Sequence, residues 1–111
     1  MDAFELRDIA EERKKLGKLY YEFLRKPSIS AGLYVLAAGR DDPQQPHTED
    51  EVYHVVRGRA TIRVADEDRP VRPGSVVYVA AGVPHRFHTI EEELEVLVVF
   101  TPAEDARRAG D

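Results

Sequence analysis

The sequence predicts an all-β fold, a small sandwich or closed barrel, with one helix in front of it. Two observations support this prediction. Short runs of β-branched and aromatic residues are separated at regular spacing by turn residues, mostly glycine, proline and aspartate. A helical period of apolar residues occurs only near the start of the chain. A length of 111 residues is enough for one domain with one modest core.

The composition excludes several classes of protein. The formal charge of -5, from 16 basic and 21 acidic side chains, gives no basic face for nucleic acid. The absence of cysteine excludes disulfides, thiolate nucleophiles and cysteine-rich zinc sites. The longest apolar run, 76–83, is too short to span a bilayer, so no membrane partner is expected. The acidic first residues do not resemble a signal peptide, so we expect a cytoplasmic protein.

The first element is expected to be a helix over residues 2–16. Its apolar residues recur at helical spacing: Leu6, Ile9, Leu16 and Tyr20. Asp2 can cap the helix, with Glu5 three residues later as in a capping box. Gly17 suits a left-handed C-terminal cap. The mixed charges on the polar face favour a short amphipathic helix packed on the outside of a barrel.

The rest of the chain predicts strands separated by turns. The expected strands are 19–24, 30–37, an apolar strand that ends at a glycine turn at Gly58, 60–65, 75–80, 85–90 and 94–101. Between the last two, residues 91–93 are expected to form a solvated turn. We therefore divide the chain into a helix and lead-in strand (1–26), one barrel (27–101) and a polar tail (102–111) that is expected to be flexible.

Two segments place a histidine at the end of a strand. A turn-rich acidic loop carries His47 and Glu51 into an apolar strand, and His85 follows a proline-containing turn at the start of another. Two histidines and one carboxylate are the usual facial set for a divalent transition metal with open positions.

The loop and strand from 39 to 58 resemble the first motif of the cupin superfamily. That motif is a glycine, five residues, His-x-His, three or four residues, Glu, six residues and a glycine. This chain has Gly39, five residues, Gln45, one residue, His47, three residues, Glu51, six residues and Gly58. One position departs from the pattern, because Gln45 stands where the first histidine is expected.

The second motif of the same family is a glycine, five residues, Pro-x-Gly, two residues, His, three residues and Asn. This chain has Gly74, five residues, Ala80 in place of the proline, Gly82, His85 after two more residues, and Thr89 in the last place. The two motifs and the fifteen residues between them cover 39–89. The resemblance implies a compact single-domain bacterial-type cupin. Its fold would be a small double-stranded β-helix (cupin or jelly-roll barrel) with one N-terminal helix.

The resemblance also implies a metal site formed by His47, Glu51, His85 and the residue at position 45. Gln45 can ligate only through its amide oxygen, which leaves three possibilities. It is a weaker fourth ligand, it binds through a water, or the site is vestigial. Oxygen and imidazole donors suit one divalent ion of iron, manganese, nickel, cobalt or zinc, and the sequence does not choose among them.

The residues around this set receive roles from strand parity. Tyr53 and Phe87 share the ligand face and are expected to line a substrate-binding pocket as well as the core. His54 and His88 have the opposite parity, which predicts outward or interface positions. Glu49 at the mouth is expected to be a solvated charge. No residue is assigned a catalytic role.

Three functions remain open at this point. The chain is a metal-dependent enzyme on a small polar molecule, of dioxygenase or isomerase/lyase type, or a binding module without turnover, or a metal-stabilised structural dimer. The resemblance to compact cupins implies a homodimer. The apolar outward faces of Val52, Val56 and the last strand give a physical reason to expect one.

Overall fold

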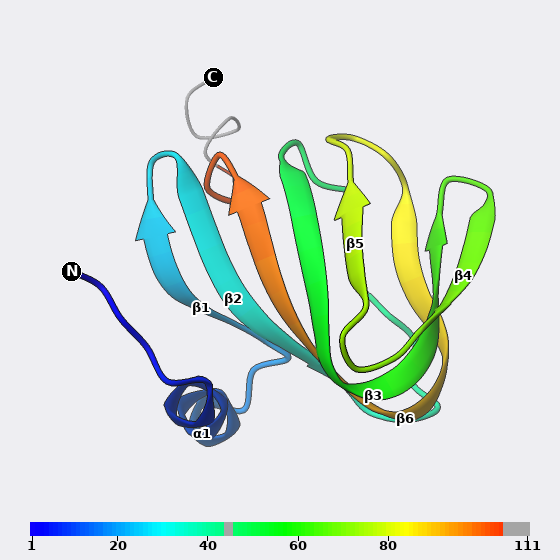
Figure 1. Cartoon of the computed structure of the whole chain (residues 1–111), viewed down its shortest axis with the longest axis horizontal. Helices are drawn as coiled ribbons and strands as arrows, with labels where there is room; N and C mark the ends of the chain where they lie inside the picture. The colour runs from blue at the N-terminus through cyan, green and yellow to red at the C-terminus, as the bar shows by residue number, and fades with distance from the viewer. Residues whose placement is uncertain (44–45, 106–111) are drawn as a thin grey trace.

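The computed structural model describes residues 1–43 and 46–105 and contains one helix and one antiparallel sheet (Figure 1). The elements in chain order are α1 (Leu6–Leu16), β1 (Tyr20–Lys26), β2 (Ile29–Leu36), β3 (Asp50–Val64), β4 (Glu67–Val71), β5 (Val76–Val79) and β6 (His85–Thr101). Within the described residues, no helix is both long and apolar enough to cross a membrane. The all-β fold with one N-terminal helix is confirmed.

The sheet is organised around a long ribbon formed by β3 and β6. The strands lie in the order β1-β2-β6-β3-β4, and β5 pairs with β3 beside this path. The first part of β3 pairs with the last part of β6, as at Glu51 opposite Phe100, and the end of β3 pairs with the start of β6, as at Val64 opposite His85. Figure 1 shows the ribbon bending back on itself, so that its two ends rise on either side of β5.

The bend lies at Gly58, inside β3. The pairing of β3 with β6 shifts register on both sides of this residue, between Val55 and Thr61. Gly58 has a φ of 95°, and a Cβ atom there would lie 2.2 Å from the carbonyl oxygen of Glu93. Only glycine allows the two backbones to approach this closely in that conformation.

The predicted turns at 58 and 91–93 are therefore wrong. Both positions lie within continuous strands, β3 and β6, that bend without ending. Residues 91–93 are exposed, as expected of three consecutive glutamates. The strand expected at 60–65 is the second half of β3.

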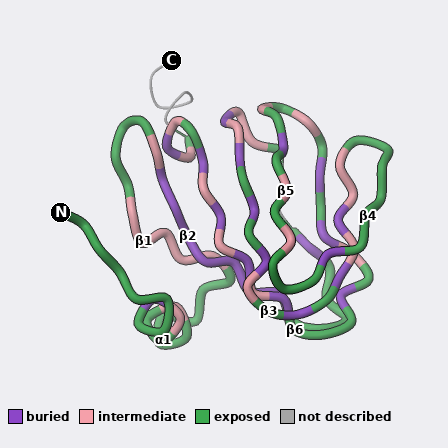
Figure 2. Tube along the Cα trace, viewed as in Figure 1, coloured by how far each residue is buried: buried purple, intermediate pink, exposed green. Residues whose placement is uncertain are grey.

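Strand β2 separates two apolar clusters, because successive side chains of a strand point to opposite faces. Tyr34 and Leu36 belong to the barrel interior, whereas Leu33 and Val35 pack with Ile9 of α1 on the outer face. Figure 2 shows β2 buried along most of its length because both of its faces are covered. The prediction of a short helix packed on the outside of the barrel is confirmed.

The start of the helix differs from the prediction. The helix begins at Leu6 and not at residue 2, and Glu5 occupies the N-cap position without a side-chain cap. Asp2 makes an ion pair with Lys26 instead, at 3.1 Å between Oδ2 and Nζ. The expected left-handed C-terminal cap is present, because Gly17 has a φ of 67°.

Candidate metal centre

Three of the four predicted ligands come together inside the barrel. His47, Glu51 and His85 each offer one ligand atom, and these atoms lie within 4.8 Å of one another. Glu51 and His85 are buried, while the side chain of His47 is 15% exposed. The bent ribbon produces this meeting, because Glu51 lies near the start of β3 and His85 opens β6. The fourth predicted ligand, Gln45, lies outside the described residues.

Glu51 and His85 are in close contact without being hydrogen-bonded in the usual geometry. His85 Nε2 lies 2.7 Å from Glu51 Oε1. Nevertheless His85 Nε2 and both carboxylate oxygens of Glu51 have no aligned hydrogen-bond partner within the described part of the chain. Two ligand atoms at about 2.0–2.2 Å from one ion and roughly at right angles lie about 3 Å apart. The two groups are thus close enough to bind one ion after a small separation of the two atoms.

Two hydrogen bonds from the turn at 81–82 hold the segment around His47 in place. The Gly82 N–H donates to the His47 carbonyl oxygen at 2.7 Å. Asp50 Oδ1 accepts from the Ala81 N–H at 2.9 Å. The loop that carries the first histidine is thus tied to the turn that leads into the second, so both histidines are positioned together.

The orientation of His85 is set by a backbone carbonyl. Its Nδ1 lies 2.8 Å from the Val83 oxygen, so in the neutral ring Nδ1–H donates to that oxygen and Nε2 keeps a lone pair. Burial lowers the pKa of His85. Contacts with Glu51 and Val83, together with the Asp42 carboxylate, raise this pKa by more, so the net shift is upward.

A buried aspartate supports the floor of the site. Asp42 Oδ1 accepts from the Tyr34 hydroxyl at 2.5 Å, and its Oδ2 accepts from the Phe87 N–H at 2.9 Å. One carboxylate therefore connects the loop before His47 to β2 and β6. Burial and the bond to Asp42 raise the pKa of Tyr34, so its hydroxyl stays protonated.

Glu104 belongs to the site, although sequence reasoning gave it no role. Its Oε2 lies 3.4 Å from His47 Nδ1. The backbone holds it there, because its N–H donates to the buried Ser30 Oγ at 2.8 Å and its carbonyl accepts from Arg25 at 2.9 Å. These contacts belong to the described part of the segment that was expected to be a flexible tail. The rest of that segment, 106–111, lies outside the described residues.

The carboxyl group of Glu104 is unusually basic. Burial, followed by the nearby carboxylates of Asp105, Glu22, Glu51 and Glu49, raises its pKa to about 7. No sequence signal identifies this residue, because Pro102 marks the end of the last strand and the contact with His47 forms only in the folded chain.

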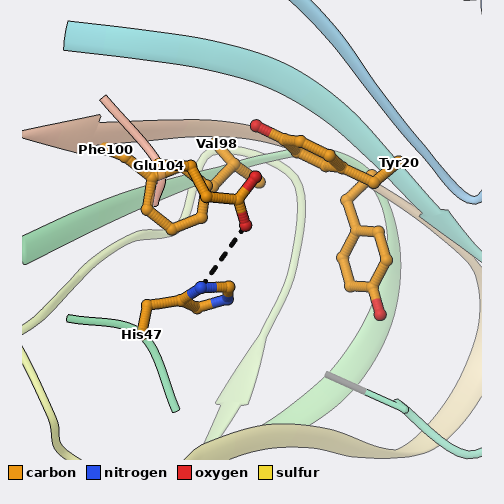
Figure 3. Close-up of a pocket in the computed structure, with 6 residues that line it drawn as sticks. Tyr20, His47, Val98, Phe100 and Glu104 are labelled. Atoms are coloured by element: carbon orange, nitrogen blue, oxygen red, sulfur yellow. Dashed lines mark ion pairs between the residues drawn. The ribbon is translucent and has the colours of Figure 1, made fainter. Parts of the chain in front are cut away.

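A small pocket of about 100 Å³ opens beside His47. Its lining residues are Tyr20, Tyr34, His47, Val98, Phe100 and Glu104. Figure 3 shows Glu104 facing His47 across the pocket, with Tyr20 along another wall. Tyr20 was expected to continue the apolar stripe of the helix and to lie in the strand 19–24, and it was given no role in a site. Burial raises the pKa of Tyr20, and the negative charge of Glu104 adds to this effect, so its hydroxyl stays protonated.

The remaining predicted residues occupy varied places. Tyr53 and Phe87 are fully buried, and their ring centroids lie 5.1 Å apart. Tyr53 also packs on His85 at 5.9 Å, so these residues support the ligand while other side chains line the pocket in Figure 3. Their substrate-binding role stays a prediction. His54 is exposed, and His88 Nε2 pairs with Asp68 away from the site at 2.7 Å.

The prediction for Glu49 is wrong. It is only 1% exposed, and it accepts a hydrogen bond from the neighbouring Thr48 hydroxyl. The acidic loop therefore turns this carboxylate inward instead of leaving it in solvent.

The sequence and the fold identify the family. The model of the cupin domain matches residues 32–100, and the chain belongs to the cupin family. A protein of Streptomyces coelicolor described as uncharacterised is 54% identical over 104 residues, which cover 94% of this chain and 99% of the relative.

Solved structures show the same architecture. An RmlC-like cupin of Methanocaldococcus jannaschii with a double-stranded β-helix fold matches with a TM-score of 0.72 and 20% identity, over 85% of this chain and 86% of that one. The DMSP lyase DddQ of Ruegeria pomeroyi matches with a TM-score of 0.69 and 24% identity. That match covers 74% of this chain but only 45% of the lyase. The double-stranded β-helix is thereby confirmed.

Proposed function

We propose that this cupin binds one divalent transition metal ion through His47, Glu51 and His85 and uses it to bind a small polar molecule. One observation carries the proposal. The ligand atoms of these three residues lie within 4.8 Å of one another in the barrel. The atoms Glu51 Oε1, Glu51 Oε2 and His85 Nε2 have no aligned hydrogen-bond partner in the described chain. Buried polar atoms without partners are costly, and a bound ion would satisfy them.

The donor set fits such an ion. Two imidazoles and one carboxylate suit iron, manganese, nickel, cobalt or zinc and leave positions open for other ligands. All three ligand atoms already lie within 4.8 Å of one another, so side-chain movements, without any change of the strands, would bring them to one ion. Such an ion would act as a Lewis acid toward an oxygen of the bound molecule.

The protein's own groups prepare the site. The Val83 carbonyl faces Nδ1 of His85, and the Glu104 carboxylate faces Nδ1 of His47. In each ring, the other nitrogen is then available to a metal. Phe100 packs edge-on against the His47 ring at a centroid distance of 4.7 Å and restricts its orientation. The ligand set is thereby oriented before an ion arrives.

An enzyme of dioxygenase or isomerase/lyase type is the function that we favour for this site. Two features support this function: a set of metal ligands that leaves positions open on the ion, and a neighbouring pocket with room for only a small molecule. The likeness to DddQ concerns the fold alone, so it does not select the reaction. Gln45, where the family pattern has histidine, favours the alternative of a binding module without turnover.

We also propose that the chain forms a homodimer. Three apolar side chains on neighbouring strands β3 and β5 are solvent-exposed: Val52 at 38%, Val76 at 67% and Tyr78 at 60%. Val52 pairs directly with Tyr78, so they form one outward patch. The cytoplasmic location stays a prediction.

Metal analysis of freshly purified protein tests the site. We expect about one equivalent of a transition metal in the wild type and a loss of most of it in a His47→Ala/His85→Ala variant. The matched control is His54→Ala/His88→Ala, which removes two histidines outside the site and should keep the metal. A wild type that holds no metal and takes none up on reconstitution would refute the site, and equal metal in all three proteins would refute the ligand assignment.

A further inference from the structure

A second cavity lies at the other end of the barrel from the proposed metal ligands. It is formed by the second half of β3, by β4 and by the connection from β4 to β5. In Figure 1, this connection passes the bend of β3, whereas β3 and β6 both begin at the opposite end of the barrel. The volume of about 540 Å³ is in the usual range for sites that hold small molecules.

The cavity gathers positive charge without matching negative charge. Three arginines line it, Arg59, Arg69 and Arg72, and no carboxylate is among the described residues that do so. The chain as a whole has 21 acidic and 16 basic side chains, so this local excess of cations is opposite to the net charge. Cations that line one cavity repel one another and attract an anion.

These arginines lack the close partners that other arginines of the chain have. Arg57 and Arg63 of β3 bind carboxylates at 3.0 and 2.8 Å. Arg59 lies 3.9 Å from the carboxylate that it faces, at the outer limit of an ion pair. The side chains of Arg69 and Arg72 make no hydrogen bond or ion pair within the described residues. Their guanidinium donors are therefore available to a ligand.

The backbone that carries these arginines is held by hydrogen bonds. The Ser75 N–H donates to the Arg72 carbonyl oxygen at 2.9 Å, and the Arg72 N–H donates to Ser75 Oγ at 3.0 Å. The Gly74 N–H donates to the Val55 carbonyl oxygen of β3 at 2.8 Å. Arg69 belongs to β4, which pairs with β3. The frame is therefore formed before a ligand binds, which lowers the entropy cost of binding.

We infer that this cavity is a binding site for a small organic molecule that carries a phosphate monoester group. A doubly charged phosphate matches two unpaired guanidinium groups, and the forked donors of arginine bind phosphate oxygens in pairs. Part of the wall is apolar, formed by Pro70, Pro73 and Val76, and would contact the organic part. The net charge of -5 repels a long polyanion, which disfavours nucleic acid.

This site is independent of the proposed metal centre. His47, Glu51 and His85 are not among the described residues that line the cavity. Binding of a phosphate here therefore needs no metal ion, and the two proposals are tested separately.

Phenyl phosphate is the probe, because at about pH 7.5 it has a doubly charged phosphate and one apolar ring. Isothermal titration calorimetry at low salt measures its binding to the wild type and to Arg69→Gln/Arg72→Gln. Val76 also belongs to the patch proposed for the dimer, so the titration uses the protein in the assembly that it forms in solution.

The matched control is Arg57→Gln/Arg63→Gln. It removes the same amount of charge from two arginines that do not line the cavity and already have carboxylate partners. Both variants should keep a melting temperature close to that of the wild type, because these arginines belong to neither buried cluster.

We expect Arg69→Gln/Arg72→Gln to bind phenyl phosphate at least about tenfold more weakly than the wild type, because it loses two charged donors. The control should remain within about twofold of the wild type. Benzoate has the same ring but one charge, and inorganic phosphate has the charge but no ring. Both should bind the wild type more weakly than phenyl phosphate does.

The melting temperature gives an independent readout. Phenyl phosphate should raise it in the wild type and in the control, because a ligand that binds only the folded state stabilises that state. The rise should be much smaller in Arg69→Gln/Arg72→Gln.

Four outcomes would overturn the inference. The first is a wild type that does not bind phenyl phosphate, and the second is an equal effect of the two arginine variants. The third is benzoate or inorganic phosphate binding as tightly as phenyl phosphate. The fourth is binding that is lost in His47→Ala/His85→Ala and kept in Arg69→Gln/Arg72→Gln, which would place the phosphate at the metal centre.

Discussion

At the scale of single residues, the site depends on which nitrogen each histidine leaves free. The Val83 carbonyl faces Nδ1 of His85 at 2.8 Å, and Glu104 faces Nδ1 of His47 at 3.4 Å. Partners of this kind fix the ring orientation of metal-binding histidines and raise their basicity. Glu104 therefore matters to the proposed metal site although it lies outside the family motifs.

We expect Glu104→Ala to lower the affinity for a transition metal by about 10- to 100-fold, which is typical for the loss of such a partner. Glu104→Gln, which keeps an acceptor but loses the charge, should fall between this variant and the wild type. Competition with a chromophoric chelator measures the affinities. Glu22→Gln, a change of a nearby carboxylate that pairs with Arg25, should have little effect. Identical affinities for all four proteins would show that Glu104 does not support His47.

At the scale of elements, the bent β3–β6 ribbon creates the site. The bend brings Glu51 near one end of the ribbon to 2.7 Å from His85 near the other. Gly58 permits the bend, because its φ of 95° and its contact with the Glu93 backbone exclude a side chain. The glycine is thus required for the geometry of the proposed metal site, in which it takes no direct part.

Gly58→Ala should lower the free energy of unfolding by at least about 2 kcal/mol and weaken metal binding, because it strains the backbone at the bend. Gly39→Ala is the matched control. Gly39 also has a positive φ, 75°, but a Cβ atom there would meet nothing within 4 Å. The control should lose only about 1 kcal/mol and keep its metal affinity. Urea denaturation measures both, and equal losses would contradict a special role for the bend.

The same residues show how far the sequence predicts this structure. The spacing of the glycines and of His47, Glu51 and His85 predicts the barrel. It also predicts that these three side chains lie close together. It does not predict that Gly58 continues a strand, because a left-handed glycine is equally typical of a turn and of a bulge. The contact of Glu104 with His47 and the place of Tyr20 in the pocket were missed because they depend on segments distant in sequence, which local patterns do not encode.

At the scale of the whole molecule, the fold separates a buried polar site from an apolar outer patch. The site lies within the barrel, and Val52, Val76 and Tyr78 lie on the outer face of β3 and β5. Acidic residues outnumber basic ones, 21 to 16, so an attractive interface has to rely on apolar contact more than on net charge.

The homodimer is tested by Val76→Lys, which places a charge on a side chain that is 67% exposed and should not disturb the barrel. We expect the wild type to be a dimer and the variant a monomer, because an unpaired charge inside an interface is strongly unfavourable. Light scattering after size-exclusion chromatography measures the mass. Glu91→Lys, at another exposed position, should remain dimeric. A monomeric wild type, or a variant that stays dimeric, would refute this interface.

The most direct test of the metal centre is anomalous X-ray diffraction from crystals of the metal-loaded protein, recorded at the absorption edge of the bound metal. We predict a single strong peak about 2.0–2.2 Å from one nitrogen of His47, one nitrogen of His85 and a carboxylate oxygen of Glu51. A peak elsewhere in the molecule, or none in the barrel at full metal loading, would contradict the proposal that these three residues hold the ion.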